Sequence, residues 1–156
     1  MRNRFALAVL AILSAFVGLH AADDPMLGSW KLNVGKSRLG SGTAIKAETN
    51  RVEPYGGNGI KLTAEITRPD GSKVTESYAG TFDGKEFSVG GDPNVDAAYL
   101  KRIDAYTMER VNKKAGKPTT TMHYVVSKDG KTKTVTITGT TAQGNPVDTV
   151  LIFEKR

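Results

Sequence analysis

The chain has 156 residues, no cysteine and a formal net charge of +6. The lack of cysteine excludes disulfides and thiolate metal sites, so the stability of a folded domain must come from burial and strand pairing. The lysines and arginines form no basic run interleaved with aromatic residues. This argues against a nucleic-acid interface and favours solvated outer faces that make weak contact with anionic surfaces.

The first residues predict a secretory signal peptide over residues 1–21. Two arginines precede an apolar run over residues 5–19, and Leu19-His20-Ala21 is a suitable small-residue cleavage site. The run is shorter than the roughly 20 residues that a spanning helix needs, although a retained anchor is the alternative. No cysteine follows the run, which excludes a lipidated N-terminus. Cleavage leaves residues 22–156 as one periplasmic or secreted domain of charge +4, because the leader carries two arginines and no acid.

Residues 27–34 predict the first strand of that domain. Trp30, Leu32 and Val34 alternate with polar residues, and a period of two is typical of a half-buried strand. Trp30 is the only tryptophan, and Gly28 leaves room for another segment to pass close to the backbone. We therefore expect this strand to enter a core and to begin the sheet.

Further strands with turns between them follow along the first half of the chain. A Gly/Ser-rich loop over residues 35–42 is too long for a hairpin turn. Pro69-Asp70-Gly71 and Asp83-Gly84 are hairpin signals. We expect strands over residues 46–55, 60–67, 74–82 and 87–89, with Ile60, Leu62, Ala64 and Ile66 marking the clearest inward face.

The second half of the chain continues the same pattern. Residues 97–103 predict a strand, although Val95, Ala98 and Arg102 also fit helical spacing. The threonine- and valine-rich segments that follow favour a pleated sheet. About ten short strands and no long amphipathic helix indicate an all-β fold, a single up-and-down antiparallel β-barrel of about 8–10 strands, with a β-sandwich as the alternative. The remaining strands are expected over residues 106–112, 119–127, 132–139 and 147–154.

Both ends of this domain resemble a known superfamily. Gly28-Ser29-Trp30 resembles the Gly-x-Trp signature of the lipocalins, and the closing segment over residues 150–156 is similar to that of the calycins, which unite lipocalins and fatty-acid-binding proteins. The resemblance implies an exported, bacterial-type lipocalin-like barrel whose first and last strands are neighbours. It also implies that Lys155 or Arg156 packs over Trp30 and closes the base of the barrel, with the arginine preferred because its planar group stacks on an indole.

The chain also departs from the family pattern. The disulfides of the family are absent, since the chain has no cysteine. Leu151 and Phe153 stand where fatty-acid-binding proteins carry an Arg-x-Tyr pair that holds a carboxylate. The departure argues against a fatty acid as the ligand.

Residue types that carry catalysis are sparse. His123 is the only histidine beyond the leader, and Met122 and Tyr124 occupy the more apolar, opposite face of its strand. We expect His123 to point to solvent, with a buried functional histidine as the alternative. No nucleophile elbow, phosphate loop or His-rich metal site is present. We therefore expect no enzymatic activity, no metal and no cofactor.

A few charged residues fall on inward faces by alternation. Glu76 shares a face with Tyr78, so it either needs a partner inside a barrel or indicates a shifted strand register. The same alternation places Arg102 and Arg110 on inward faces, and an inward arginine could bind an anionic headgroup. Paired surface arginines are the interpretation that we favour for both, and the other carboxylates are interpreted as surface charge.

Two hypotheses for function follow. In the first, a monomeric barrel encloses a small hydrophobic or amphipathic ligand, with no nucleic-acid partner and no stable membrane insertion after cleavage. In the second, a filled barrel acts through its outer surface as an inhibitor or envelope-assembly module, using the loop over residues 36–46 and the turn over residues 56–59. A lumen below about 300 Å³ favours the second hypothesis. The ligand-binding residues expected under the first are Trp30, Leu62, Ile66, Glu76, Tyr78, Phe82, Arg110, Tyr124 and Phe153.

Overall fold

The computed structural model describes residues 24–40 and 44–156, so the predicted leader and residues 41–43 of the first loop lie outside it. Within this part of the chain, one antiparallel sheet contains ten strands in the order β4-β3-β2-β1-β10-β9-β8-β7-β6-β5. The strands are β1 (Gly28–Leu32), β2 (Ala47–Pro54), β3 (Gly59–Thr67), β4 (Lys73–Thr81), β5 (Phe87–Ser88), β6 (Ala97–Asp104), β7 (Thr107–Lys114), β8 (Lys117–Val126), β9 (Thr132–Thr140) and β10 (Pro146–Lys155).

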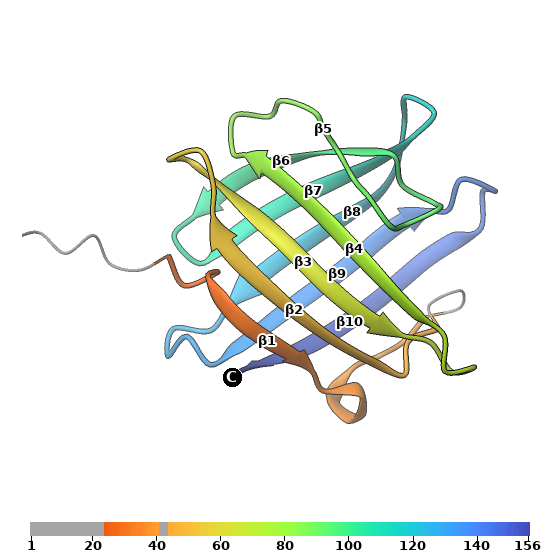
Figure 1. Ribbon diagram of the computed structural model, residues 1–156, viewed down its shortest axis with the longest axis horizontal. Helices are drawn as coiled ribbons and strands as arrows, with labels where there is room; N and C mark the ends of the chain where they lie inside the picture. Colours follow the sequence, from red (N-terminus) through yellow and green to blue (C-terminus); the bar gives the residue numbers. More distant parts are fainter. Residues whose placement is uncertain (1–23, 41–43) are drawn as a thin grey trace, which may run out of the picture.

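The sheet curls into a barrel of two layers. Figure 1 shows β1 to β4 crossing steeply over the strands β6 to β10. Because β1 pairs with both β2 and β10, the first and last strands are neighbours, with Trp30 opposite Lys155 and Leu32 opposite Phe153. The predicted up-and-down barrel and the meeting of the chain's two ends are therefore confirmed.

The strand predicted over residues 97–103 is also confirmed, as β6. Its residues alternate between the two faces: Ala98 and Leu100 are fully buried, whereas Lys101 is exposed. Alternation with a period of two is typical of a strand, and the segment does not form the helix that the spacing of Val95, Ala98 and Arg102 also allowed.

The predicted hairpin at Asp83-Gly84 is wrong. The strand after the turn, β5, pairs with β6 and not with β4, so β4 and β5 are the two edges of the sheet. The Asp83 carboxylate accepts hydrogen bonds from Thr81 Oγ1 and from the backbone of Lys85, which holds a wide turn instead of a tight one.

A backbone bridge, with a stacked aromatic pair beside it, joins those two edges. Ser77 and Gly90 exchange backbone hydrogen bonds of 3.0 and 2.9 Å. The ring of Phe87 stacks on Tyr78 with the ring centroids 5.1 Å apart. Next to the pair, Gly91 has a φ of 89°, and a Cβ there would lie 1.8 Å from the carbonyl oxygen of Thr75, so only glycine allows the edges to meet.

The first strand ends earlier than predicted. β1 stops at Leu32, and Val34 begins a 3-10 turn, Val34–Lys36, in which the valine is 38% exposed. The side chain of Asn33 accepts a hydrogen bond of 3.1 Å from the backbone of Lys36. This local bond draws the backbone away from the strand ladder, so the apparent alternation of Val34 with Trp30 has no structural counterpart.

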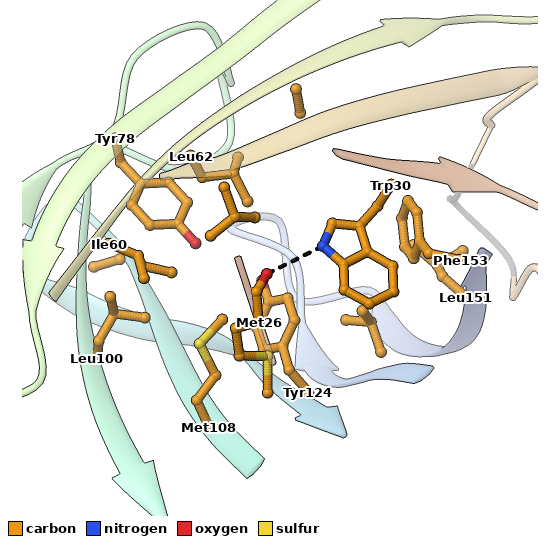
Figure 2. Packing of buried hydrophobic residues seen from close by; sticks show 14 of the residues in the cluster. Met26, Trp30, Ile60, Leu62, Tyr78, Leu100, Met108, Tyr124, Leu151 and Phe153 are labelled. Atoms are coloured by element: carbon orange, nitrogen blue, oxygen red, sulfur yellow. Dashed lines mark hydrogen bonds between the residues drawn. The ribbon is translucent and has the colours of Figure 1, made fainter. Parts of the chain in front are cut away.

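The base of the barrel is closed by the segment that precedes β1. Trp30 is fully buried and donates a hydrogen bond of 3.1 Å from its indole nitrogen to the carbonyl oxygen of Met26, which is itself 1% exposed (Figure 2). The Nζ atom of Lys155 lies 5.1 Å from the centroid of the Trp30 ring. Of the two basic residues predicted to cover the tryptophan, Lys155 therefore does so.

Candidate functional site

The barrel contains a cavity of about 230 Å³. One end reaches the loops around Asn94 and Thr141, and the other reaches Phe153, next to the buried Trp30. Much of its wall is apolar, with side chains contributed by both layers of the sheet. The predicted residues that line it are Leu62, Ile66, Glu76, Arg110, Tyr124 and Phe153.

The other three predicted residues lie elsewhere. Trp30 and Tyr78 are buried in the core around the cavity and are not part of its lining. Phe82 is half-buried and follows the end of β4 at Thr81, so it no longer continues the alternation of that strand. The centroid of its ring lies 4.1 Å from the guanidinium carbon of Arg102, and neither residue lines the cavity. The prediction that Phe82 lines the lumen is therefore wrong.

An ion pair crosses the interior between the two layers. Arg110 on β7 donates from Nη1 to Oε1 of Glu76 on β4 at 2.6 Å, and the two side chains are 2% and 14% exposed. The guanidinium carbon also lies 4.4 Å from the centroid of the Tyr78 ring. The inward placement of Glu76 is confirmed, and the expectation of a surface position for Arg110 is wrong, because a buried acid compensates its charge. Arg102 is half-buried and pairs with Asp24.

The ion pair uses only part of the hydrogen-bonding capacity of Arg110. Its Nε and Nη2 atoms are buried and have no hydrogen-bond partner among the described residues, and the same holds for Tyr78 Oη and Asn112 Oδ1. Burial is the largest single influence and lowers the pKa of Arg110, but Glu76, Tyr78 and Tyr124 together outweigh it, so the pKa is raised. Arg110 thus lines the cavity as a permanent cation, with two donor nitrogen atoms that have no hydrogen-bond partner among the described residues.

A second polar group lies toward the closed end of the same cavity. Lys133 on β9 is 2% exposed and donates from Nζ to Asn50 Oδ1 at 3.0 Å, while Asn50 donates from Nδ2 to Glu48 Oε1 at 3.0 Å. The Nζ atom lies 4.7 Å from the centroid of the Trp30 ring and 5.0 Å from that of Phe153. The three polar side chains all line the cavity.

The sequence interpretation missed this second group, since it placed the lysines on solvated faces and left the inward face of β2 unassigned. A signal was present in the alternation of Lys133 with Val135 and Ile137, which puts the lysine on the inward face of β9. The same period of two places Glu48 and Asn50 on one face of β2.

Burial shifts the protonation of this group toward the neutral forms. It lowers the pKa of Lys133 from 10.5 to about 7, with Glu48 acting in the opposite direction and Lys155 in the same one. It raises the pKa of Glu48, against the hydrogen bond from Asn50 and the charge of Lys133. A low dielectric disfavours the charged forms of both side chains.

The lowered pKa of Lys133 predicts a pH-dependent stability. Between pH 7 and 10.5 the unfolded chain holds a proton that the folded chain has lost, so the free energy of unfolding rises with pH in this window, and the penalty is full below pH 7. Relative to Lys133→Met, the native protein is expected to gain stability in urea unfolding between about pH 7 and pH 9.5. Parallel curves for the two proteins would show that Lys133 keeps an ordinary pKa.

His123 lies on an exposed position of β8, while Tyr124 beside it is buried, as predicted. Among residues 24–40 and 44–156, no three His, Cys, Asp or Glu side chains gather as a metal site would require. No helix in the same part of the chain is long and apolar enough to cross a membrane.

Comparison with solved structures places the barrel in a known fold. The fluorescent protein UnaG in its wild-type form superposes with a TM-score of 0.57 at 17% sequence identity, covering 84% of this chain and 97% of that one. An asparagine-to-alanine mutant of UnaG gives a TM-score of 0.58 at 17% identity, covering 85% and 96%. The fold is calycin-like. No family model and no curated protein sequence matches the chain.

Within this calycin-like barrel, the polar anchors differ from those that the resemblance implied. Leu151 and Phe153 on β10 are buried apolar residues, as the departure from the Arg-x-Tyr pattern indicated. The charged groups come instead from β4 and β7 on one side and from β2 and β9 on the other. The polar groups of this lumen therefore lie on other strands than the Arg-x-Tyr pair of the fatty-acid-binding proteins.

Proposed function

We propose that this calycin-like barrel is a non-enzymatic binding protein that holds a small, neutral, amphipathic molecule in its lumen. The observation that carries the proposal is Arg110, a 2% exposed arginine at the cavity wall whose Nε and Nη2 atoms make no hydrogen bond of normal geometry to any described residue. A buried donor is costly unless it meets an acceptor. A ligand with a carbonyl-type oxygen and an apolar body satisfies both the arginine and the surrounding wall of Leu62 and Ile66.

The charges around the cavity favour a neutral ligand over a carboxylate. Glu76 already compensates Arg110 at 2.6 Å. Burial lowers the pKa of Lys133 and raises that of Glu48, so neither supplies a strong unpaired charge. A ligand carboxylate would add an uncompensated negative charge to this interior, at considerable cost. A ketone, ester or aldehyde oxygen accepts the same hydrogen bonds without that cost.

The cavity volume supports a second candidate function. At about 230 Å³, the lumen is smaller than the roughly 300 Å³ at which ordinary ligand pockets begin. That value favours a barrel that acts through its outer surface as an inhibitor or assembly module. The two candidates differ in one respect that can be measured, which is whether filling the lumen abolishes binding of a small molecule.

A cavity-filling variant makes that measurement. Ala64 is 3% exposed, lines the cavity and lies directly across from Glu76 in the β3–β4 ladder. With methyl cinnamate as a neutral probe and cinnamate as its anionic counterpart, calorimetry of the native protein is expected to show tighter binding of the ester. Ala64→Leu is expected to weaken that binding by at least about tenfold. The larger side chain would occupy space that the ligand needs, and steric conflict of this size costs about 1–3 kcal/mol.

The matched control is Ala47→Leu, an exposed alanine on the neighbouring strand β2. It is expected to leave binding of methyl cinnamate unchanged. If neither probe binds the native protein, or if Ala64→Leu binds as well as Ala47→Leu, the lumen is not the site and the surface function is favoured.

We further propose that the barrel works as a monomer outside the cytoplasm. Support comes from the two arginines, the apolar run over residues 5–19 and the small-residue site at Ala21. N-terminal sequencing of the protein made by a cell that exports it is expected to begin at residue 22. A product that keeps its first residues in the membrane fraction would show a retained anchor instead.

A further inference from the structure

The lumen contains an amine in an unusual setting. Lys133 lines the cavity and is 2% exposed, and its Nζ atom donates a hydrogen bond of 3.0 Å to Asn50. The aromatic rings of Trp30 and Phe153 lie within 4.7 and 5.0 Å of it. The hydrogen-bond partner of Lys133 is an amide and not a carboxylate, so no directly bonded acid holds the amine in its charged form.

We propose that Lys133 forms a Schiff base with an aldehyde held in the lumen, so that the barrel captures this class of carbonyl compound covalently. The inference rests on the proposed function, since the aldehyde must first enter the same cavity. The carbonyl oxygen and apolar body that suit the lumen are also the features of such an aldehyde. The geometry further requires that the carbonyl carbon reach the cavity end at which Lys133 and Phe153 meet.

The reaction balances without any additional reactant. The lone pair of the neutral amine forms a bond to the carbonyl carbon, and a proton moves from nitrogen to oxygen to give a carbinolamine. The nitrogen lone pair then expels the hydroxyl group, which takes up a proton and leaves as water, and loss of the second amine proton leaves a carbon–nitrogen double bond. Loss of the hydroxyl needs an acid, and Glu48, which lines the same cavity, can supply the proton.

The protonation states of the group suit these steps. Burial lowers the pKa of Lys133 to about 7, so a large fraction of the amine is neutral at pH 7, whereas an ordinary lysine is neutral in only about one molecule in several thousand. Burial also raises the pKa of Glu48, which favours its proton-donating form. The charged groups that face Lys133 are Glu48 from β2 and Lys155 from β10, and both enter its titration.

Reductive trapping tests the proposal directly. The protein is incubated with trans-cinnamaldehyde near pH 7, reduced with sodium cyanoborohydride, digested and mapped by mass spectrometry. We expect one reduced cinnamyl group on Lys133, in at least about tenfold excess over any other lysine, because a depressed pKa activates the amine. Labelling of Lys133 is expected to fall below pH 7 and to stay level above it, whereas exposed lysines react increasingly up to about pH 10.

Two variants separate the lumen from the outer surface. Lys133→Met is expected to remove the dominant adduct. Lys155→Met is expected to keep it, although Lys155 lies 5.1 Å from the same Trp30 ring. The map of the native protein decides the question even if Lys133→Met does not fold. Adducts spread over exposed lysines, with Lys133 unmodified, would overturn the proposal.

A probe of the same shape distinguishes this inference from the proposed function. Methyl cinnamate fits the same space but carries an ester, which does not form a Schiff base. It is expected to bind and to protect Lys133 from cinnamaldehyde. Binding of methyl cinnamate with no adduct on Lys133 would overturn the covalent step alone, whereas failure of both probes would overturn the proposed function as well.

Discussion

Replacing Glu76 by alanine is expected to destabilise the barrel by about 3–5 kcal/mol, the cost of leaving a buried charge without its partner. Arg110 is 2% exposed and Glu76 is 14% exposed, with 2.6 Å between Nη1 and Oε1. The guanidinium group cannot lose its proton to relieve this cost, because an arginine stays protonated in proteins even without an acidic partner. Urea unfolding of Glu76→Ala and of the native protein measures the difference.

Two controls make this first result specific. Glu154→Ala removes one partner of an ion pair with Lys36 whose side chains are 48% and 66% exposed, and should cost less than about 1 kcal/mol. The double variant Glu76→Leu with Arg110→Met removes both buried charges and should recover much of the lost stability. A cost for Glu76→Ala as small as that of Glu154→Ala would contradict a buried pair.

Replacing Trp30 by alanine is expected to cost about 3–5 kcal/mol, the usual range for a buried aromatic residue. The ring is fully buried, its nitrogen bonds to Met26 at the closed base, and it packs where β1 meets β10 (Figure 2). The change therefore removes core packing and also releases the segment that closes the barrel.

The matched control for the tryptophan is Tyr55→Ala, since Tyr55 is an aromatic residue that is 47% exposed. It is expected to change the free energy of unfolding by less than about 0.5 kcal/mol. Chemical denaturation of both variants supplies the comparison. Similar values for Trp30→Ala and Tyr55→Ala would show that the closed base contributes little to stability.

Much of the fold can be predicted from the sequence because strands and turns have local signals. The alternation from Ile60 to Ile66 depends only on neighbouring residues, and so does the outward position of His123. The pairing of β1 with β10 follows from the order of hairpins, because the ends of a closed meander must meet. Failures at Val34 and Phe82 occur at strand ends, where Asn33 and Asp83 divert the backbone by local hydrogen bonds.

The site itself is less accessible to sequence reasoning. Alternation can place Glu76 and Arg110 on inward faces, but it does not reveal that they meet, since 34 residues separate them. Lys133 and Asn50 are 83 residues apart, so the alternation that places Lys133 on the inward face of its strand does not reveal its partner. Which side chains meet across the lumen depends on how the two layers of the sheet lie over each other. The spacing of residues along the chain does not reveal these contacts.

The central claim, that the donors of Arg110 meet a ligand inside the barrel, can be tested at the atoms concerned. The Nε–H group of an arginine gives its own resonance in nitrogen-15 NMR spectra, and Arg110 Nε has no hydrogen-bond partner among the described residues. On titration with methyl cinnamate, we expect this resonance to shift and its exchange with water to slow, with the shift absent in Ala64→Leu. A ligand that perturbs only the outer loops and leaves the Arg110 resonance unmoved would contradict a lumenal site.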